Sequence, residues 1–242
     1  IRLSLVGSEM CIRDRDTTVF LLASLSKVFT GTAAMQLHEN GIINLDDAIT
    51  DYLPWSVYNP NYPNDVITFR QLMTHTSSIQ DNGIVLDTYY DYPDPTISLA
   101  DCMQRYFSIS GVDYDPDENF LTDAPGDYYM YSNIATALNG YLVERAADMP
   151  FDDYCTENIF APLCMSKTAW HIAAFDTNEV ARPYAYSGGN YVPYPHYGFA
   201  DYPDGQLRSN VVDIGNFMLA YLSGGMLGTN SFVSQASINE MW

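Results

Sequence analysis

The chain has 242 residues, of which 47% are hydrophobic and 17% charged. This is enough apolar material for a full hydrophobic core and excludes a disordered or collagen-like chain. Ten Lys and Arg residues stand against 30 Asp and Glu residues, which gives a formal net charge of −20. Such acidity argues against a nucleic-acid partner and against docking on anionic lipid, because both need basic surfaces. No apolar run approaches the ~20 residues of a membrane-spanning helix.

The first fifteen residues differ in composition from the rest of the chain. They contain three of the eight arginines, and the run 5–15 (LVGSEMCIRDR) resembles the in-frame translation of a sequencing-library adapter. The alternative is an ordinary N-terminal strand and turn. We expect residues 1–15 to be non-native and residues 16–242 to be part of one domain, an internal piece of a longer protein. Without Cys11, three cysteines remain (Cys102, Cys155 and Cys164), which we expect to be free buried thiols.

Helix signals dominate the first half of the body. Residues 24–39 predict a helix that ends at Gly41. A short helix is expected to reach Tyr52, and Thr68 and Gln71 form a capping box that opens another. Residues 80–127 are rich in Tyr, Asp and Pro and are expected to form a long surface excursion with one helix near Leu99–Phe107.

The second half predicts three further helices. Ser132 or Asn133 caps a helix whose apolar side chains share one face. Residues 150–160 predict the next helix, and residues 209–221 the third, followed by a pair of glycines that stops it.

The remaining segments predict loops and a helix start. Residues 166–208 are expected to be loop-like, with a short strand candidate at 168–172. Near the C-terminus, Ser237 at the N-cap position and Glu240 three residues later form a capping box that predicts a last helix.

Ser24 and Lys27 form the first candidate catalytic pair. Their S-x-x-K spacing near the start of a predicted helix places both side chains on one face. A serine hydroxyl is a weak nucleophile until a base removes its proton, and a lysine can be that base if burial lowers its pKa. The first helical turn also places backbone N–H groups near a developing oxyanion. A capping serine and a solvated lysine are the alternative, and the pattern alone does not decide between them.

Tyr131 and Asn133 form the second candidate element, a Y-x-N pattern just before a helix. A tyrosine beside a lysine can share a proton-transfer role, since positive charge favours the phenolate. An asparagine two residues later can hydrogen-bond a substrate amide. A packing tyrosine and an N-cap asparagine are the alternative.

Taken together and in this order, the blocks resemble the serine β-lactamase and penicillin-binding-protein superfamily, in particular its class C-like branch of β-lactamases, D-Ala-D-Ala carboxypeptidases and esterases. The resemblance extends over residues 16–242. The blocks that carry it are residues 20–31 (FLLASLSKVFTG), 41–47 with 52–54, 67–77, 125–133, 157–165 and 204–213.

The resemblance implies a role for each candidate residue. Ser24 is expected to be the acylated nucleophile, Lys27 its proton acceptor or electrostatic partner, and Tyr131 the general base, with Asn133 binding the substrate amide. The implied function is a serine acyl hydrolase that acts on a small molecule or peptide with an amide, lactam or ester bond, without metal or cofactor. An extracytoplasmic location is implied as well, and no feature indicates nucleic acid or membrane contact.

The resemblance also implies an incomplete fold. The family's third motif, Lys/His-x-Gly on an edge strand, has no match after Arg208, and Ser78 stands where the family has glycine after Thr-Ser. We therefore expect an α+β, β-lactamase/transpeptidase-like chain that holds mostly the helical part, with most of the antiparallel sheet missing. The parent protein is expected to be active and this piece inactive, because losing one oxyanion donor raises the barrier by ~2.7–4 kcal/mol.

Four further points concern alternatives and weaker candidates. A non-catalytic binding protein on the same scaffold, with an acidic and Tyr-rich surface, is the alternative to the enzyme. The run 113–118 is similar to a calcium loop but lacks the glycine and the final glutamate of an EF-hand, which favours a solvated acidic loop. His75 matches a family position and is expected to be structural. The Tyr- and Trp-rich segments 52–63, 89–92 and 184–202 either line a cleft or bind sugar rings, or they pack over loops.

Overall fold

The architecture described below is that of a computed structural model, which describes residues 15–241. Residues 1–14 and 242 lie outside the described part of the chain, and so does nearly all of the segment expected to be adapter-derived. In the part that the structure describes, no helix is both long and apolar enough to cross a membrane.

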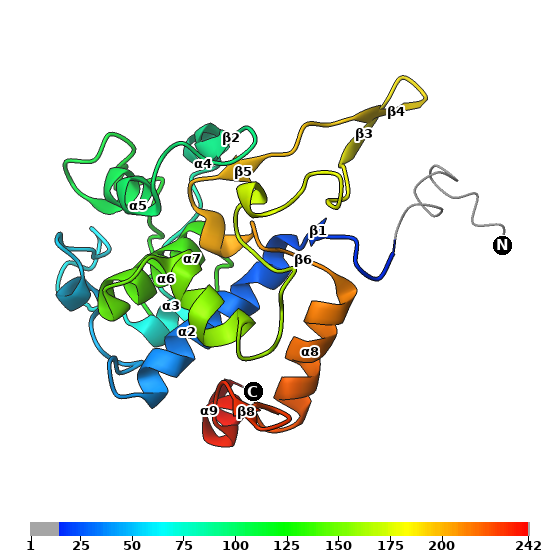
Figure 1. Cartoon of the computed structure of the whole chain (residues 1–242). Helices are drawn as coiled ribbons and strands as arrows, with labels where there is room; N and C mark the ends of the chain where they lie inside the picture. The colour runs from blue at the N-terminus through cyan, green and yellow to red at the C-terminus, as the bar shows by residue number, and fades with distance from the viewer. Residues whose placement is uncertain (1–14, 242) are drawn as a thin grey trace.

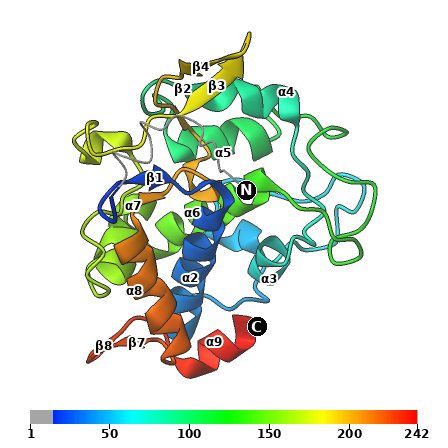
Figure 2. The same ribbon diagram turned by 90° about the vertical axis from the view of Figure 1, so that its right-hand side faces the viewer.

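Helix α2 (Ser26–Glu39) runs through the middle of the molecule (Figure 1). It packs against α6 (Asn133–Ala147), and the two helices bury nearly all of their side chains on the facing sides. Helix α8 (Val211–Leu222) lies beside α2 in both views (Figures 1 and 2), where the rings of Phe29 and Phe217 stack with centroids 4.1 Å apart. The core is therefore built around α2, and the N-terminal end of α2 is left facing an open pocket.

Shorter elements surround these three helices. The remaining helical segments are η1 (Ala23–Leu25), η2 (Ile49–Tyr52), α3 (Phe69–Met73), α4 (Gly83–Leu86), η3 (Asp87–Tyr89), α5 (Leu99–Phe107), α7 (Phe151–Cys155), the π-helical turn η4 (Thr156–Phe160), η5 (Ile172–Ala174), η6 (Tyr202–Asp204) and α9 (Gln235–Met241). The strands are β1 (Phe20–Leu21), β2 (Tyr90–Asp91), β3 (Tyr184–Ser187), β4 (Asn190–Pro193), β5 (Gly198–Phe199), β6 (Arg208–Ser209), β7 (Met226–Leu227) and β8 (Asn230–Ser231).

The strands form four two-stranded antiparallel ribbons within residues 15–241: β1–β6, β2–β5, β3–β4 and β7–β8. Helices therefore outweigh strands, and the prediction of a mainly helical α+β chain is confirmed. The β1–β6 ribbon positions the site, because it places the chain just before α2 against the segment that follows η6. The backbone bond from Leu22 N to Leu207 O (2.8 Å) continues this pairing toward Ser24.

Several predicted starts and ends are confirmed. Thr68 and Gln71 form the reciprocal capping box of α3, and Ser132 caps α6 by accepting from Ala135 N at 3.1 Å. Helix α5 spans Leu99–Phe107 as expected, with its apolar face buried.

Two local predictions are wrong. Ser237 lies inside α9 and does not cap it. Ser234 has that role, accepting from Ser237 N at 3.2 Å, while the Ser237 hydroxyl donates to Glu39. The strand expected at 168–172 is reduced to a single bridge between Ala169 and Arg208. The regular hairpin in this region is β3–β4, which turns at two glycines with positive φ and projects from the body (Figure 1).

Candidate active site

Ser24 lies in the 3₁₀ turn η1, at the point where the chain enters α2. The preceding residue, Ala23, has a left-handed φ of 49°, a conformation that costs a non-glycine residue roughly 1–2 kcal/mol and is often found at functional sites. The Ser24 side chain is exposed, and its hydroxyl receives a hydrogen bond from Tyr131 Oη at 2.9 Å. Lys27 Nζ approaches the same oxygen at 3.5 Å, one helical turn along. A phenol and an ammonium group therefore converge on one alcohol.

Lys27 is held in place by two shorter bonds. Its Nζ donates to Asn133 Oδ1 at 2.7 Å and to the backbone carbonyl of Asp204 at 2.6 Å. It also stands 5.0 Å from the centroid of the Tyr131 ring, a cation–π distance. The ammonium group is thus fixed between α6, η6 and Tyr131, at the N-terminal end of α2 that follows Ser24.

Asp81 organises the N-terminal turn of α6. Its carboxylate accepts four hydrogen bonds, from Ser132 Oγ (2.9 Å), Asn133 N (3.0 Å), Asn133 Nδ2 (2.7 Å) and Ile134 N (3.1 Å). A carboxylate at this end also complements the helix dipole. Because Asn133 Nδ2 donates to Asp81, its Oδ1 is turned toward Lys27. Asp81 therefore sets the orientation of the asparagine that holds the ammonium group.

His75 supports the tyrosine. Its ring lies 4.5 Å from the Tyr131 ring, its Nδ1 accepts from Ser132 N at 3.3 Å, and its carbonyl accepts from Met130 N at 2.8 Å. Burial, with a further contribution from the charge of Lys27, lowers the pKa of His75, so the ring is neutral at pH 7. A neutral ring that accepts from a backbone N–H is an anchor for the Tyr131 loop, in keeping with the structural role expected for it.

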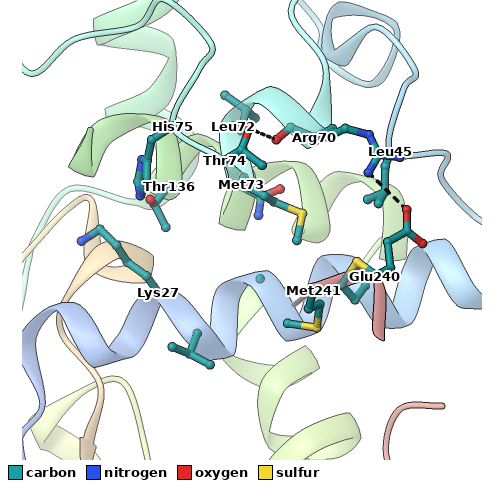
Figure 3. A pocket seen from close by; sticks show the side chains of 14 residues that line it. Lys27, Leu45, Arg70, Leu72, Met73, Thr74, His75, Thr136, Glu240 and Met241 are labelled. Carbon is teal, nitrogen blue, oxygen red and sulfur yellow. Dashed lines mark hydrogen bonds and ion pairs between the residues drawn. The ribbon is translucent and has the colours of Figure 1, made fainter. Parts of the chain in front are cut away.

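Two cavities flank Lys27. One, of about 400 Å³, contains Ser24, Lys27 and Asn133 in its wall, together with Tyr90 and Tyr197 from the Tyr-rich segments. The other, of about 370 Å³, lies between α2, α3 and α9 (Figure 3). In Figure 3 Lys27 projects from α2 toward His75 and Thr136, and the Arg70–Glu240 ion pair (3.2 Å) lies at the opposite end. Of the two cavities, only the first has Ser24 in its wall.

The first cavity is strongly acidic. Its wall contains four aspartates, namely Asp81, Asp87, Asp201 and Asp204. Asp201 and Asp204 are 4% and 5% exposed, and their carboxyls hydrogen-bond each other. Burial raises the pKa of Asp201 to about 6, and burial together with the charge of Asp201 raises the pKa of Asp204 well above its usual range. Two carboxyls in this arrangement share a proton.

The structure brings together the four residues chosen from sequence, Ser24, Lys27, Tyr131 and Asn133. Sequence reasoning missed Asp81 and the Asp201–Asp204 pair. Asp81 lies in a segment interpreted as a surface excursion, and no local pattern marks it. Asp204 was noted within a family block, but nothing in the run around it indicates burial.

Side chains of the acidic run 113–118 bond to other groups of the protein. Asp113 binds Arg105 (2.7 Å) and Tyr89 (3.0 Å), and Asp115 accepts from the backbone of the following turn. Residues 15–241 contain no group of three or more His, Cys, Asp or Glu side chains arranged to hold a metal ion. The calcium-loop hypothesis therefore finds no support in the described part of the chain.

The cysteine prediction is wrong for one of three residues. Cys102, Cys155 and Cys164 are all free, but Cys164 is exposed. Cys164 lies in the turn that follows η4, and its own φ is 55°.

Comparison with known proteins identifies relatives of this chain. The sequence model of the Beta-lactamase family matches residues 14–242. Among curated proteins, protein flp of Staphylococcus aureus is 25% identical over 204 residues, which is 84% of this chain and 38% of flp. Penicillin-binding protein 4* of Bacillus subtilis is 28% identical over 156 residues, 64% of this chain and 31% of that protein. The chain thus spans about a third of the length of these curated relatives, 38% of one and 31% of the other.

The fold is shared with solved structures. A penicillin-binding protein from Bacillus halodurans superposes with a TM-score of 0.70 at 23% identity, over 93% of this chain and 64% of that one. The expected β-lactamase/transpeptidase-like architecture is confirmed. A match over almost the entire sequence, together with this fold, shows that the chain belongs to the beta-lactamase family.

Proposed function

We propose that the protein is a serine acyl hydrolase that works through an acyl-enzyme on Ser24. The observation that carries the proposal is the convergence of Tyr131 Oη (2.9 Å) and Lys27 Nζ (3.5 Å) on the Ser24 hydroxyl. A nucleophile within hydrogen-bond reach of its base, with the base fixed by further groups, is the arrangement that activates a serine. Here Asn133, the Asp204 carbonyl and His75 are the fixing groups.

In the acylation step, Ser24 Oγ attacks the carbonyl carbon of the substrate. The Oγ–C bond forms, the carbonyl electron pair moves to oxygen, and the serine proton passes to the Tyr131–Lys27 pair, which enters this step with one proton fewer than a phenol and an ammonium group carry together. The negative charge develops next to the N-terminal end of α2, whose dipole stabilises it. When the tetrahedral intermediate collapses, the bond to the leaving group breaks, and the leaving group takes the proton back from the pair.

Deacylation repeats the sequence with water. The Tyr131–Lys27 pair takes a proton from a water molecule, the hydroxide oxygen bonds to the acyl carbon, and the Oγ–C bond breaks. The proton then returns to Ser24 Oγ, and the acid product leaves. Lactam, amide and ester carbonyls are all compatible with these steps, and the penicillin-binding proteins among the relatives favour a β-lactam or peptide. The same relatives favour an extracytoplasmic location.

Covalent labelling tests the proposal. The full-length protein is incubated with a fluorescent penicillin and, separately, with a fluorescent fluorophosphonate, and is then separated on a denaturing gel. We expect labelling of the wild type and none of Ser24→Ala. Ser223→Ala, which changes an exposed serine at the end of α8, is the matched control and keeps the label. Labelling of Ser24→Ala at the wild-type rate would refute the proposal, and no labelling of a folded wild type would favour a non-catalytic binding protein.

A further inference from the structure

We propose that the cavity beside Ser24 selects substrates with a positively charged amine, which the buried Asp201–Asp204 pair and the neighbouring aromatic rings receive. The inference rests on the proposed function, since it assigns a substrate class to the same site. It arises from the lining of the 400 Å³ cavity, where four aspartates stand against one basic residue, Lys27.

The four aspartates are not equivalent. Asp81 is engaged by four donors from the start of α6, and Asp87 is exposed at the rim. Asp201 and Asp204 are different, since each is at least 95% buried and both belong to the cavity wall. Among residues 15–241 no Lys, Arg or His side chain forms an ion pair with either carboxyl. Apart from the bond between them, no side-chain donor in this part of the chain bonds to the two carboxyls.

A buried carboxyl pair without a cation is an unfavourable arrangement. Removing a charge from water costs several kcal/mol, and a partner of opposite charge or a shared proton must offset this cost. Lys27 forms no ion pair with either carboxyl, because its ammonium group bonds to the backbone carbonyl of Asp204 and to Asn133, although its charge lowers the pKa of both carboxyls. The shared proton offsets part of the cost and leaves the pair with one negative charge, so the pair retains acceptor capacity for a cation that arrives with the substrate.

Aromatic rings complete the receptor for a cation. Tyr90, Tyr197 and Phe199 line the same cavity, with the Tyr90 ring centroid 5.7 Å from that of Tyr197 and 5.2 Å from that of Phe199. Ring faces attract ammonium groups through their quadrupole. Carboxyls and rings in one pocket both favour an ammonium group, and both disfavour a carboxylate in the same position.

Three fluorophosphonates of equal tail length test the inference, because the reaction at the serine is the same for each: an Oγ–P bond forms and fluoride leaves. Their tails end in an ammonium, a hydroxyl or a carboxylate group. The second-order rate of Ser24 modification is measured on the full-length protein in 0.5 M NaCl, which screens the long-range field of the −20 chain. We expect the ammonium probe to react about tenfold faster than the hydroxyl probe, and the carboxylate probe to react the slowest; tenfold corresponds to ~1.4 kcal/mol.

Variants distinguish the effect of the two cavity aspartates from that of the acidic surface elsewhere. In the double variant Asp201→Asn/Asp204→Asn, the ammonium-to-hydroxyl rate ratio is expected to fall to near one. Asp65→Asn, which removes an exposed charge elsewhere, is the control and keeps the ratio. Equal rates for the three probes on the wild type would overturn the inference and leave the proposed function standing, and so would an equal fall of the ratio in Asp65→Asn. Failure of all three probes to modify Ser24 would refute the proposed function itself. If the double variant does not fold, the relative rates of the three probes on the wild type still test the inference.

Discussion

Asp81 offers a quantitative test of how the site is held together. Its carboxylate accepts two backbone N–H groups of the first turn of α6 and two side-chain donors, at 2.7–3.1 Å. A capping bond to the backbone contributes ~1 kcal/mol, and bonds to a charged group contribute somewhat more. Water in the adjacent cavity can replace part of the hydrogen bonding that the substitution of Asp81 removes. We therefore expect Asp81→Ala to lower the free energy of unfolding by ~3 kcal/mol.

Urea denaturation with matched variants measures this loss. Asp81→Asn retains the size of the side chain but turns an amide N–H₂ toward donors, so we expect a loss of ~2–3 kcal/mol. Asp87→Asn, at the rim of the same cavity, is the control and is expected to change the free energy by less than ~0.5 kcal/mol. A loss below ~1 kcal/mol for Asp81→Ala at an unchanged m-value would show that the four bonds do not stabilise α6 as reasoned.

Three further predictions follow from the same geometry. Tyr131→Phe keeps the ring contact with His75 but removes the hydroxyl, so fluorophosphonate labelling should slow by roughly 10²–10⁴-fold with little change in Tm; equal labelling would exclude Tyr131 from proton transfer. Gly140→Ala would place a methyl group 2.5 Å from Pro203 Cβ, so calorimetry should show a Tm lower by roughly 4–8 °C, for a loss of ~2 kcal/mol; an unchanged Tm would mean that η6 yields easily. His75 is half-buried with a lowered pKa, so below pH 6.5 the unfolded chain takes up a proton that the folded chain does not, and stability falls as the pH decreases. His75→Asn, which tolerates the φ of 57°, should show a shallower fall of unfolding free energy between pH 7 and 5, and an equal slope would contradict this assignment.

Local signals predicted the helices well because their determinants lie within a few residues of each other. Thr68 with Gln71 and Ser132 with Ala135 satisfy the first-turn N–H groups that any helix leaves free. The C-terminal helix shows the limit of such patterns. Both Ser234 and Ser237 are suitable caps by residue type, and the choice is made by Glu39, which bonds to Ser234 N and to the Ser237 hydroxyl from the end of α2.

The site was predictable only in part, for reasons of distance along the chain. Ser24 and Lys27 are joined by helical spacing, but Tyr131 lies 107 residues from Ser24, and its approach to 2.9 Å was expected from family resemblance alone. Asp201 and Asp204 lie in a proline-containing turn where aspartates are ordinarily solvated. Their burial comes from the packing of η6 against α2 and α6, which no local pattern records.

Identification of the labelled atom tests the central claim most directly. After reaction of the full-length protein with a fluorophosphonate, trypsin cleavage after Lys27 releases the peptide that ends at Lys27 and contains Ser24 and Ser26. Ser26 is a built-in control, since its buried hydroxyl accepts a hydrogen bond from Leu207 N at 3.0 Å. Tandem mass spectrometry is expected to place the phosphonyl group on Ser24 and none on Ser26. A stoichiometric adduct on any other residue, with Ser24 unmodified, would contradict the account.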